Sequence, residues 1–167
     1  MSTGHIDAPD AGGIRIVEAL THGLRMGEIS VRHEVFVTEQ RVPPVLEIDA
    51  RDFDPAVRHL VALDRGGRVI ATVRLIPEEG GYHLGRLAVR PRWRGRRVGA
   101  ALVLAAHDLV AGLTPPGASA AVVLDSQVQA RGFYERLGYR AVTGEVFLDA
   151  GIEHVTMARE VPGRAPH

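Results

Sequence analysis

An arginine- and glycine-rich turn is the part of this chain whose residue types best suit a charged ligand. It lies within residues 84–111, where an apolar stretch passes through the turn into a second, longer apolar stretch. Gly95 and Gly99 lie where the backbone must approach another group closely. A strand that leads through such a turn onto a helix N-terminus directs backbone N–H groups and the helix dipole toward an anion. The residues therefore predict a cradle for a polyphosphorylated ligand. Six arginines crowd this turn: Arg86, Arg90, Arg92, Arg94, Arg96 and Arg97.

The composition excludes several other kinds of site. The chain contains no lysine, and both a Walker phosphate loop and a Schiff base require one. The turn also lacks the G-x-G-x-x-G spacing of the dinucleotide fingerprint. The 167 residues have a formal net charge of zero, so the arginines form a local patch that favours a small anion over a nucleic acid. Because the chain has no cysteine, it has no thiol nucleophile, disulfide or cysteine-ligated zinc.

Hydrophobic periodicity and turn residues predict the elements that must position this turn. Their order, β-α-β-β-β-α-β-α-β-β, predicts a mixed sheet with helices on its faces. Helices are expected over residues 23–36, 98–111 and 129–137. Strands are expected over residues 14–19, 59–64, 68–76, 82–89, 118–125, 142–148 and 154–159.

The same pattern predicts one domain with short ends. We expect a disordered lead-in over residues 1–13, a domain over residues 14–160 and a flexible tail over residues 161–167. The lead-in has no apolar signal core, and no apolar run is long enough to span a membrane. We therefore expect a cytoplasmic protein without a membrane partner.

Two motifs resemble those of a known family. Residues 94–100, RGRRVGA, resemble the signature [RQ]-x-x-G-x-[GA] of the GNAT superfamily of acyl-CoA-dependent N-acetyltransferases, with Arg97 in place of the usual glycine. Residues 132–139, GFYERLGY, resemble that family's F-Y-x-x-L-G-F segment. The resemblance covers about residues 14–160. Further segments resemble a branch of small bacterial members of this family whose substrates are largely undefined. These segments are FVTEQRVP at 36–43, Glu47 with Asp49, and AGIEH at 150–154.

The resemblance implies a fold and a reaction. The fold is α/β of the α+β kind, a single domain whose mixed, mostly antiparallel twisted sheet has about six or seven strands, about four flanking helices and a splayed fourth strand. The reaction moves an acetyl group from acetyl-CoA to the primary amine of a small molecule. Direct attack in a ternary complex is expected, since the chain has no cysteine nucleophile. Analogy with the family also suggests a homodimer.

Acetyl-CoA binding is expected along the fourth strand and the arginine-rich turn. Backbone N–H groups of residues 96–100 would cap the pyrophosphate, and the backbone of residues 87–89 would pair with the pantetheine amides. The arginine side chains would either add phosphate contacts or remain solvated. The expected cofactor contacts are Leu87, Ala88, Val89, Arg94, Gly95, Arg96, Arg97, Val98, Gly99, Ala100, Phe133 and Tyr134.

The resemblance also suggests which groups move protons. Tyr134 stands where the family's tyrosine often protonates the departing thiolate, and the alternative is that it only packs on the cofactor sulfur. His83 is a candidate general base, since several members carry a catalytic carboxylate at that place and histidine titrates near neutral pH. The alternatives are a histidine with no proton to move, Glu39 or Asp49 as the base, or a water chain to a distant base. A backbone N–H near Leu87 is expected to stabilise the oxyanion.

The sequence gives the weakest signal for the residues that bind the acceptor amine. Five residues from separate segments could converge on it: Glu39, Asp49, Arg74, Arg86 and His154. Acidic residues would suit a cationic amine, and the arginines would suit an acceptor that carries a carboxylate or phosphate. An equally weighted alternative is that Arg74 and Arg86 form a buried ion pair with Glu47 or Asp49. No metal site is expected, because the histidines show no metal-ligand spacing.

Two other functions fit parts of this pattern. A non-catalytic acyl-CoA sensor or interaction module would keep the cradle and lose the chemistry. A nucleic-acid patch would use the arginines alone and would show steeply salt-dependent binding. We expect the enzyme, with acetyl-CoA and a small amine as partners and no nucleic acid.

Overall fold

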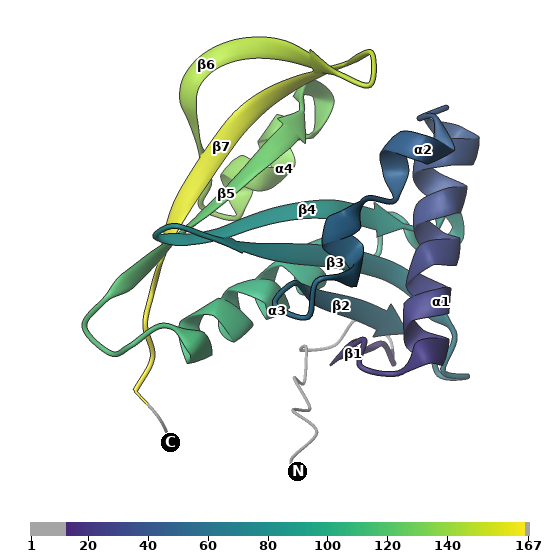
Figure 1. The fold of residues 1–167 in the computed structure, drawn as a ribbon, viewed down its shortest axis with the longest axis horizontal. Helices are drawn as coiled ribbons and strands as arrows, with labels where there is room; N and C mark the ends of the chain where they lie inside the picture. Colours follow the sequence, from purple (N-terminus) through teal and green to yellow (C-terminus); the bar gives the residue numbers. More distant parts are fainter. Residues whose placement is uncertain (1–12, 166–167) are drawn as a thin grey trace. The chain divides into compact units, whose positions relative to one another are not determined.

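A computed structural model describes residues 13–165, and its elements follow the predicted order with one short helix, α2, added before the second strand (Figure 1). The helices are α1 (His22–Arg32), α2 (Pro44–Glu47), α3 (Val98–Leu113) and α4 (Arg131–Arg136). The strands are β1 (Arg15–Glu18), β2 (Arg58–Leu63), β3 (Val69–Glu78), β4 (Gly81–Val89), β5 (Ser119–Gln127), β6 (Arg140–Asp149) and β7 (Ile152–Pro162). Short turns of other helix types are η1 (His33–Glu39), η2 (Ala50–Phe53), η3 (Pro91–Trp93) and η4 (Val128–Ala130).

Backbone pairing joins the strands in the order β1-β2-β3-β4-β5-β7-β6. β4 pairs with β5 in parallel over Gly81–His83. The pairs β1–β2, β2–β3, β5–β7 and β6–β7 are antiparallel. Seven strands in a mixed, mostly antiparallel order confirm the expected fold class, α/β of the α+β kind.

Chain contacts divide the described residues into two compact units, and the first comprises residues 13–75 and 86–106. Its strands are apolar on both faces, and β2 is buried from His59 to Leu63. Val31 and Val35 bring the apolar side of α1 and η1 into a cluster with Val61 and Ala88. Removing this apolar surface from water stabilises the unit by about 25 cal/mol per Å². Ala88 thus anchors the end of β4 that leads into the arginine-rich turn in this core.

The second unit comprises residues 76–85 and 107–165. Along β5, buried and more exposed residues alternate, as expected for a strand with one covered face. Val122, Leu124 and Met157 form its interior, where all three are almost fully buried. His107, on the apolar helix α3, is buried as well, and its Nε2 lies 2.6 Å from the Tyr139 hydroxyl. A polar partner inside the unit thus accounts for this histidine.

Two ends of predicted elements differ from the sequence-based expectation. The predicted helix over residues 23–36 continues as the π-helix η1 to Glu39, before Pro43 and Pro44. The expected tail starts too early, because β7 runs to Pro162 and Val161 is buried. Residues 1–12 of the expected lead-in and residues 166–167 of the expected tail lie outside the described residues. Within residues 13–165, no helix has the length and apolar character to cross a membrane.

Candidate functional site

The arginine-rich turn has the backbone that an anion cradle requires. Gly95 and Arg97 both have left-handed backbone angles, with φ of 74° and 62°. The Arg97 carbonyl accepts the first helical hydrogen bond of α3, from Ala101 at 3.0 Å. The N–H groups of residues 98–100 precede this bond and have no partner within the helix. They lie at the N-terminal end of α3, where the helix dipole favours a negative charge.

The side chain of Arg94 has a protein partner. Its guanidinium forms two hydrogen bonds with the Glu39 carboxylate, at 2.7 and 2.8 Å, and a third with the Val89 carbonyl at 3.1 Å. The hydrogen bond from Arg94 lowers the pKa of Glu39. Two residues predicted for different ligands, the cofactor and the acceptor, therefore bind each other in the first unit.

Three further arginines of the turn, Arg92, Arg96 and Arg97, present their charge to solvent. The guanidinium of Arg96 lies over the Trp93 ring, 5.0 Å from its centre. Arg92 and Arg97 are exposed. The positions of these three side chains match the expected alternative of solvated arginines. The backbone cradle stays a prediction, which the left-handed angles of Gly95 and Arg97 support.

Strand β4 is bent one residue before the predicted pantetheine segment. Arg86 has φ of 53°, a left-handed angle that costs a non-glycine residue about 1–2 kcal/mol. We interpret this single left-handed residue as a bulge in β4. Ala88 is buried, whereas Leu87 and Val89 are half-buried. The bulge is consistent with the expected departure of the fourth strand from regular pairing.

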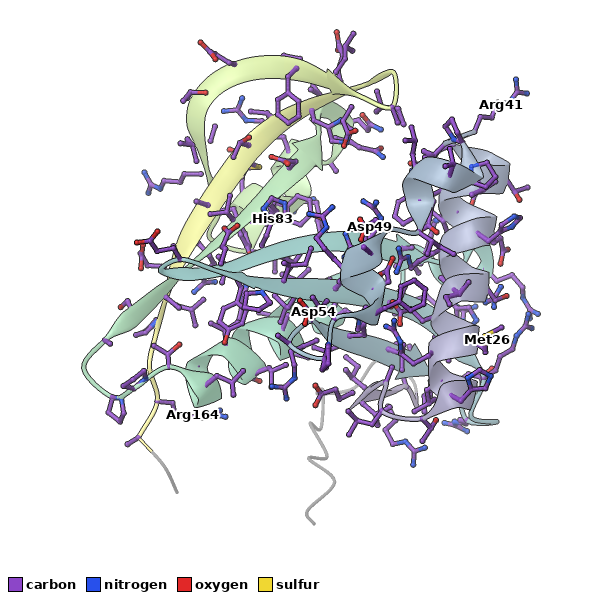
Figure 2. The ribbon with its side chains drawn as sticks, viewed as in Figure 1. Met26, Arg41, Asp49, Asp54, His83 and Arg164 are labelled. Atoms are coloured by element: carbon purple, nitrogen blue, oxygen red, sulfur yellow. The ribbon has the colours of Figure 1, made fainter. Side chains whose placement is uncertain are left out.

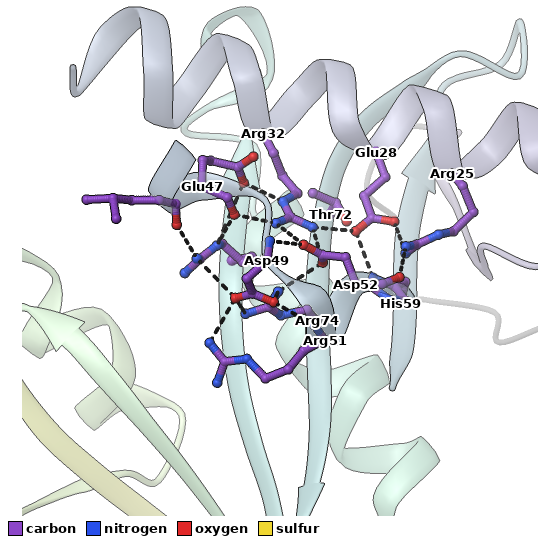
Figure 3. A network of polar contacts seen from close by, with 12 residues as sticks. Arg25, Glu28, Arg32, Glu47, Asp49, Arg51, Asp52, His59, Thr72 and Arg74 are labelled. Atoms are coloured by element: carbon purple, nitrogen blue, oxygen red, sulfur yellow. Dashed lines mark hydrogen bonds and ion pairs between the residues drawn. The ribbon is translucent and has the colours of Figure 1, made fainter. Parts of the chain in front are cut away.

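A buried cluster of charges lies between α1 and the strands of the first unit (Figure 3). At its centre, Arg32 is completely buried and donates to Glu47 at 2.5 Å, to Asp52 at 2.7 Å and to Glu28 at 3.2 Å. Burial lowers the pKa of Arg32, but its hydrogen bond to Asp52 and the charges of Glu47 and Asp52 outweigh this effect and raise it. The cluster therefore holds α1, α2 and η2 together.

Strand β3 joins this cluster through Arg74. Its guanidinium donates to Asp52 at 2.9 Å and to Asp49 at 3.2 Å, so the alternative of a buried ion pair applies to Arg74. Burial raises the pKa of Asp49 and Asp52, but hydrogen bonds from arginines outweigh it and lower both pKa values. Arg86 instead donates to the Glu47 carbonyl at 3.1 Å and to the Leu46 carbonyl at 3.2 Å.

The cluster does not provide a cation site. Ligand atoms of Glu28, Asp52 and His59 lie within 4.8 Å of one another. However, the Arg32 guanidinium lies against two of these three residues, at 2.7 Å from Asp52 and 3.2 Å from Glu28. Its fixed positive charge opposes a metal ion at this position.

In the second unit, His83 on β4, which is labelled in Figure 2, lies near an acidic residue on β5. Its Nε2 lies 3.7 Å from Oδ2 of Asp125, and Thr156 on β7 donates to the other carboxylate oxygen of Asp125 at 2.8 Å. His83 and Asp125 are both partly exposed, at 30% and 36% of their side chains. The separation of His83 and Asp125 is longer than a hydrogen bond, and Thr156 holds the Asp125 carboxylate in its place beside the imidazole.

Tyr134 is the buried residue of α4. Its ring makes edge contacts with Phe133 and Tyr139, with ring centres 4.9 and 5.7 Å apart. Burial raises the pKa of Tyr134 to about 12, compared with about 10 for an exposed phenol. The phenol therefore keeps its proton across the neutral and mildly basic range.

His154 has local partners on the strand pair β6–β7 of the second unit. Its Nδ1 lies 2.7 Å from the Ile152 carbonyl, and its ring stacks on Phe147 with centres 5.9 Å apart. The predicted acceptor residues Glu39, Asp49, Arg74 and Arg86 belong to the first unit. The structure therefore groups Asp49, Arg74 and Arg86, and gives Glu39 and His154 other partners.

Sequence reasoning missed the centre of the charged cluster and the partner of His83. Arg32 and Glu28 did carry a signal, since they are four residues apart on a helix and can face the same side. In the sequence, Glu47, Asp49 and Asp52 indicated only an acidic loop. Asp125 closes an apolar strand, and its proximity to His83 depends on a strand pairing that the sequence does not show.

Known proteins that resemble this chain in sequence or fold include N-acetyltransferases. A profile of the acetyltransferase (GNAT) domain matches residues 30–161. An uncharacterized N-acetyltransferase of Bacillus subtilis, YjcF, is 35% identical over 130 residues, which cover 78% of this chain and 88% of that protein. An acyl-CoA N-acyltransferase from Pseudomonas aeruginosa has 31% identity and a TM-score of 0.76, covering 87% of this chain and 97% of its own. An aminoglycoside 6′-N-acetyltransferase solved with coenzyme A shares the fold, with 19% identity, a TM-score of 0.64 and coverage of 90% and 99%.

Proposed function

The chain belongs to the GNAT acetyltransferase family, and on that premise we propose that this acyltransferase moves an acetyl group from acetyl-CoA to the primary amine of a small molecule. The observation that carries the proposal is the left-handed angle at Arg97, an angle that favours glycine, at the position where the family has glycine. A protein that shares this fold was solved with coenzyme A. The cradle supports the same ligand here.

The proposed contacts with acetyl-CoA are made mainly by backbone atoms. The N–H groups of residues 96–100 bind the pyrophosphate at the start of α3, where partial positive charge gathers. Leu87, Ala88 and Val89 offer backbone groups to the pantetheine arm, beyond the bulge at Arg86. When bound, acetyl-CoA supplies an acyl thioester that an amine can attack.

The proposed transfer requires one proton to leave the amine and one to reach the thiolate. The amine nitrogen attacks the thioester carbon directly, so that a C–N bond forms and the C–S bond breaks. His83 accepts the proton from the attacking amine, and the Asp125 carboxylate lies 3.7 Å from its Nε2. Tyr134 donates the proton that the leaving sulfur takes up.

The charges in the first unit favour His83 over its two rivals as the base. Glu39 and Asp49 each bind an arginine, and the pKa of each is lowered. A carboxylate with a lowered pKa is a weaker proton acceptor at neutral pH. The histidine therefore remains the stronger candidate.

The burial of Tyr134 affects its proposed role in two ways. Because its pKa is about 12, its proton is available at every working pH. The same burial raises the cost of giving that proton up by about 3 kcal/mol relative to an exposed phenol. The acid role therefore needs a direct test.

That test measures thiol release from acetyl-CoA with a broad panel of amines: amino sugars, polyamines, amino acids, peptides and aminoglycosides. We expect turnover with at least one class and a fall in kcat of about a hundredfold in Tyr134→Phe. Tyr82→Phe, at a half-buried tyrosine of β4 without an assigned role, is the matched control and should behave as the wild type. Acetyl-CoA binding without turnover on any amine would favour the sensor instead.

A further inference from the structure

The carboxylates of the charged cluster in the first unit already accept hydrogen bonds from arginines. Each accepts a hydrogen bond of 3.2 Å or less from an arginine other than Arg86. These carboxylates are Glu28, Glu47, Asp49 and Asp52, and their donors are Arg25, Arg32, Arg51 and Arg74. Four arginine side chains thus match these four carboxylates before Arg86 is counted.

Arg86 is therefore the fifth arginine beside four carboxylates. Its two hydrogen bonds go to the carbonyls of Leu46 and Glu47. The nearest carboxylate oxygens, on Glu47 and Asp49, lie at 3.7 and 3.8 Å, beyond hydrogen-bond distance. Within the described part of the chain, both hydrogen bonds of Arg86 thus go to neutral oxygens, and its only counter-charges are two long ion pairs with carboxylates that already bind other arginines.

The surroundings of Arg86 favour an added anion. Burial, and then the charges of Arg74 and Arg32, lower the pKa of Arg86, and they outweigh the opposing charges of Glu47 and Asp49. Its side chain nevertheless remains 26% exposed, so that a ligand can reach it. A partly buried guanidinium with a free edge binds carboxylate or phosphate oxygens strongly, because charge-assisted hydrogen bonds gain strength where water is scarce.

The position of Arg86 connects it with the proposed reaction. It forms the bulge of β4 and immediately precedes Leu87, the first residue proposed to bind the pantetheine arm. The two carbonyls of α2 fix the direction of its guanidinium. An anion bound there would hold an acceptor beside the strand segment that receives the thioester.

We propose that Arg86 binds an anionic group of the acceptor, a carboxylate or a phosphate, so that the substrate is an amine that also carries a negative charge. This inference rests on the proposed acetyltransferase function and narrows its substrate class. Amino acids, acidic peptides and amine phosphates belong to that class, whereas polyamines do not.

The experiment compares acceptors in matched pairs that differ only in the anionic group. Phenylalanine is compared with phenylalaninamide, and phosphoethanolamine with ethanolamine, each with acetyl-CoA at saturation. For at least one pair, we expect the wild-type kcat/KM to be about tenfold higher for the anionic member. The pair that shows the difference identifies the group as a carboxylate or a phosphate.

Variants of Arg86 then assign the preference to this side chain. Arg86→Gln should lower kcat/KM for the anionic acceptor about tenfold and change the neutral one less than about threefold. Arg86→Lys, which keeps the charge without the fork of donors, should retain part of the preference. Arg68→Gln, at an exposed arginine of the β2–β3 turn, is the control for net charge. Melting temperatures of all variants check that the fold is retained.

The outcomes separate this inference from the proposed function. Equal kcat/KM for both members of each pair, or an equal fall in kcat/KM for both in Arg86→Gln, would overturn the proposal. Either result would show that Arg86 only joins α2 to β4 through its hydrogen bonds. If no acceptor is acetylated, the proposed function fails instead. In that case, calorimetry measures the binding of the same pairs to the protein loaded with CoA. Binding of the anionic member that is lost in Arg86→Gln supports the proposed role of Arg86.

Discussion

At the scale of single residues, Arg97 shows how a side chain can change while a backbone angle stays. The sequence shows an arginine where the family has glycine, and this made the local angle uncertain. The structure keeps φ at 62°, at a cost of about 1–2 kcal/mol for a residue with a Cβ. The cradle therefore depends on the backbone at this position more than on the arginine itself.

This dependence predicts opposite results for two substitutions of Arg97. Arg97→Gly should leave the dissociation constant of acetyl-CoA within about threefold of wild type, because glycine adopts the same angle without strain. Arg97→Val should weaken binding about tenfold or more, since a β-branched residue opposes a positive φ. Isothermal titration measures both. A large loss in Arg97→Gly would instead identify the guanidinium as a phosphate contact.

The Glu39–Arg94 pair leads to a second prediction at this scale. Glu39→Gln removes a negative charge beside the cradle and releases Arg94 from its two strong hydrogen bonds. We expect acetyl-CoA to bind about threefold more tightly at low salt, with little change in melting temperature, because exposed ion pairs contribute little to stability. Glu34→Gln, which removes an acid that pairs with Arg90 instead, is a useful comparison. A tenfold weaker affinity would mean that Glu39 orients Arg94 for the ligand.

The partners of single residues were the part that sequence reasoning predicted least well. Glu39 and Arg94 are 55 positions apart, and their contact depends on η1 extending the first helix by a further turn. The pairing of Arg74 with Asp49 was only one of two equal alternatives. Such contacts arise from tertiary packing, which periodicity and motif spacing do not describe.

At the scale of elements, the junction between the turn and α3 carries the proposed cofactor site. Gly99 lies in the first turn of this helix, where a side chain would stand beside the free N–H groups. We expect Gly99→Val to raise the dissociation constant of acetyl-CoA about tenfold or more, because a branched Cβ blocks close approach. Leu104→Val, at an exposed position of the same helix, is the control for the lower helix propensity of valine. An unchanged affinity in Gly99→Val would place the cofactor elsewhere.

The charged cluster makes the stability of the first unit depend on pH. The pKa of Asp52 is lowered in the folded protein, so its contribution is present above its unfolded pKa of about 4 and is lost as pH falls further. Asp52→Asn should lower stability at neutral pH by about 3 kcal/mol and flatten the fall in melting temperature below about pH 4. Asp54→Asn, at an exposed acid that can still accept a bond from Ala56, should change neither. A steep acid limb that persists in Asp52→Asn would contradict this role.

Most elements could be predicted because their signals are local. The hairpin residues between β2 and β3 and the apolar run of α3 lie close to their expected positions. The π-helix η1 and the buried end of β7 could not be predicted in the same way. Their conformations depend on packing against distant residues, and their own sequences indicate only that a helix or strand should end.

At the scale of the whole molecule, family membership and fold were predictable, whereas the acceptor was not. Two ordered motifs indicated the family, and the sheet order confirms the fold. An acceptor site is built from side chains of several segments, and two of its five predicted residues have other partners. The expected homodimer remains a prediction that sedimentation analysis can test.

The absence of cysteine predicts how the whole enzyme should handle its two substrates. Direct attack requires both substrates to be bound together, so initial rates should give intersecting lines in double-reciprocal plots. Parallel lines, or a protein that gains acetyl groups when incubated with acetyl-CoA alone, would indicate a covalent intermediate and contradict the ternary complex.

The most direct test of the central claim is to detect the acetylated amine by mass spectrometry after incubation with acetyl-CoA and the amine panel. We predict at least one N-acetylated product, formed in equal amount with free CoA and dependent on both substrates. Binding of acetyl-CoA with no acetylated product from any amine in the panel would contradict the account and identify the protein as an acyl-CoA sensor.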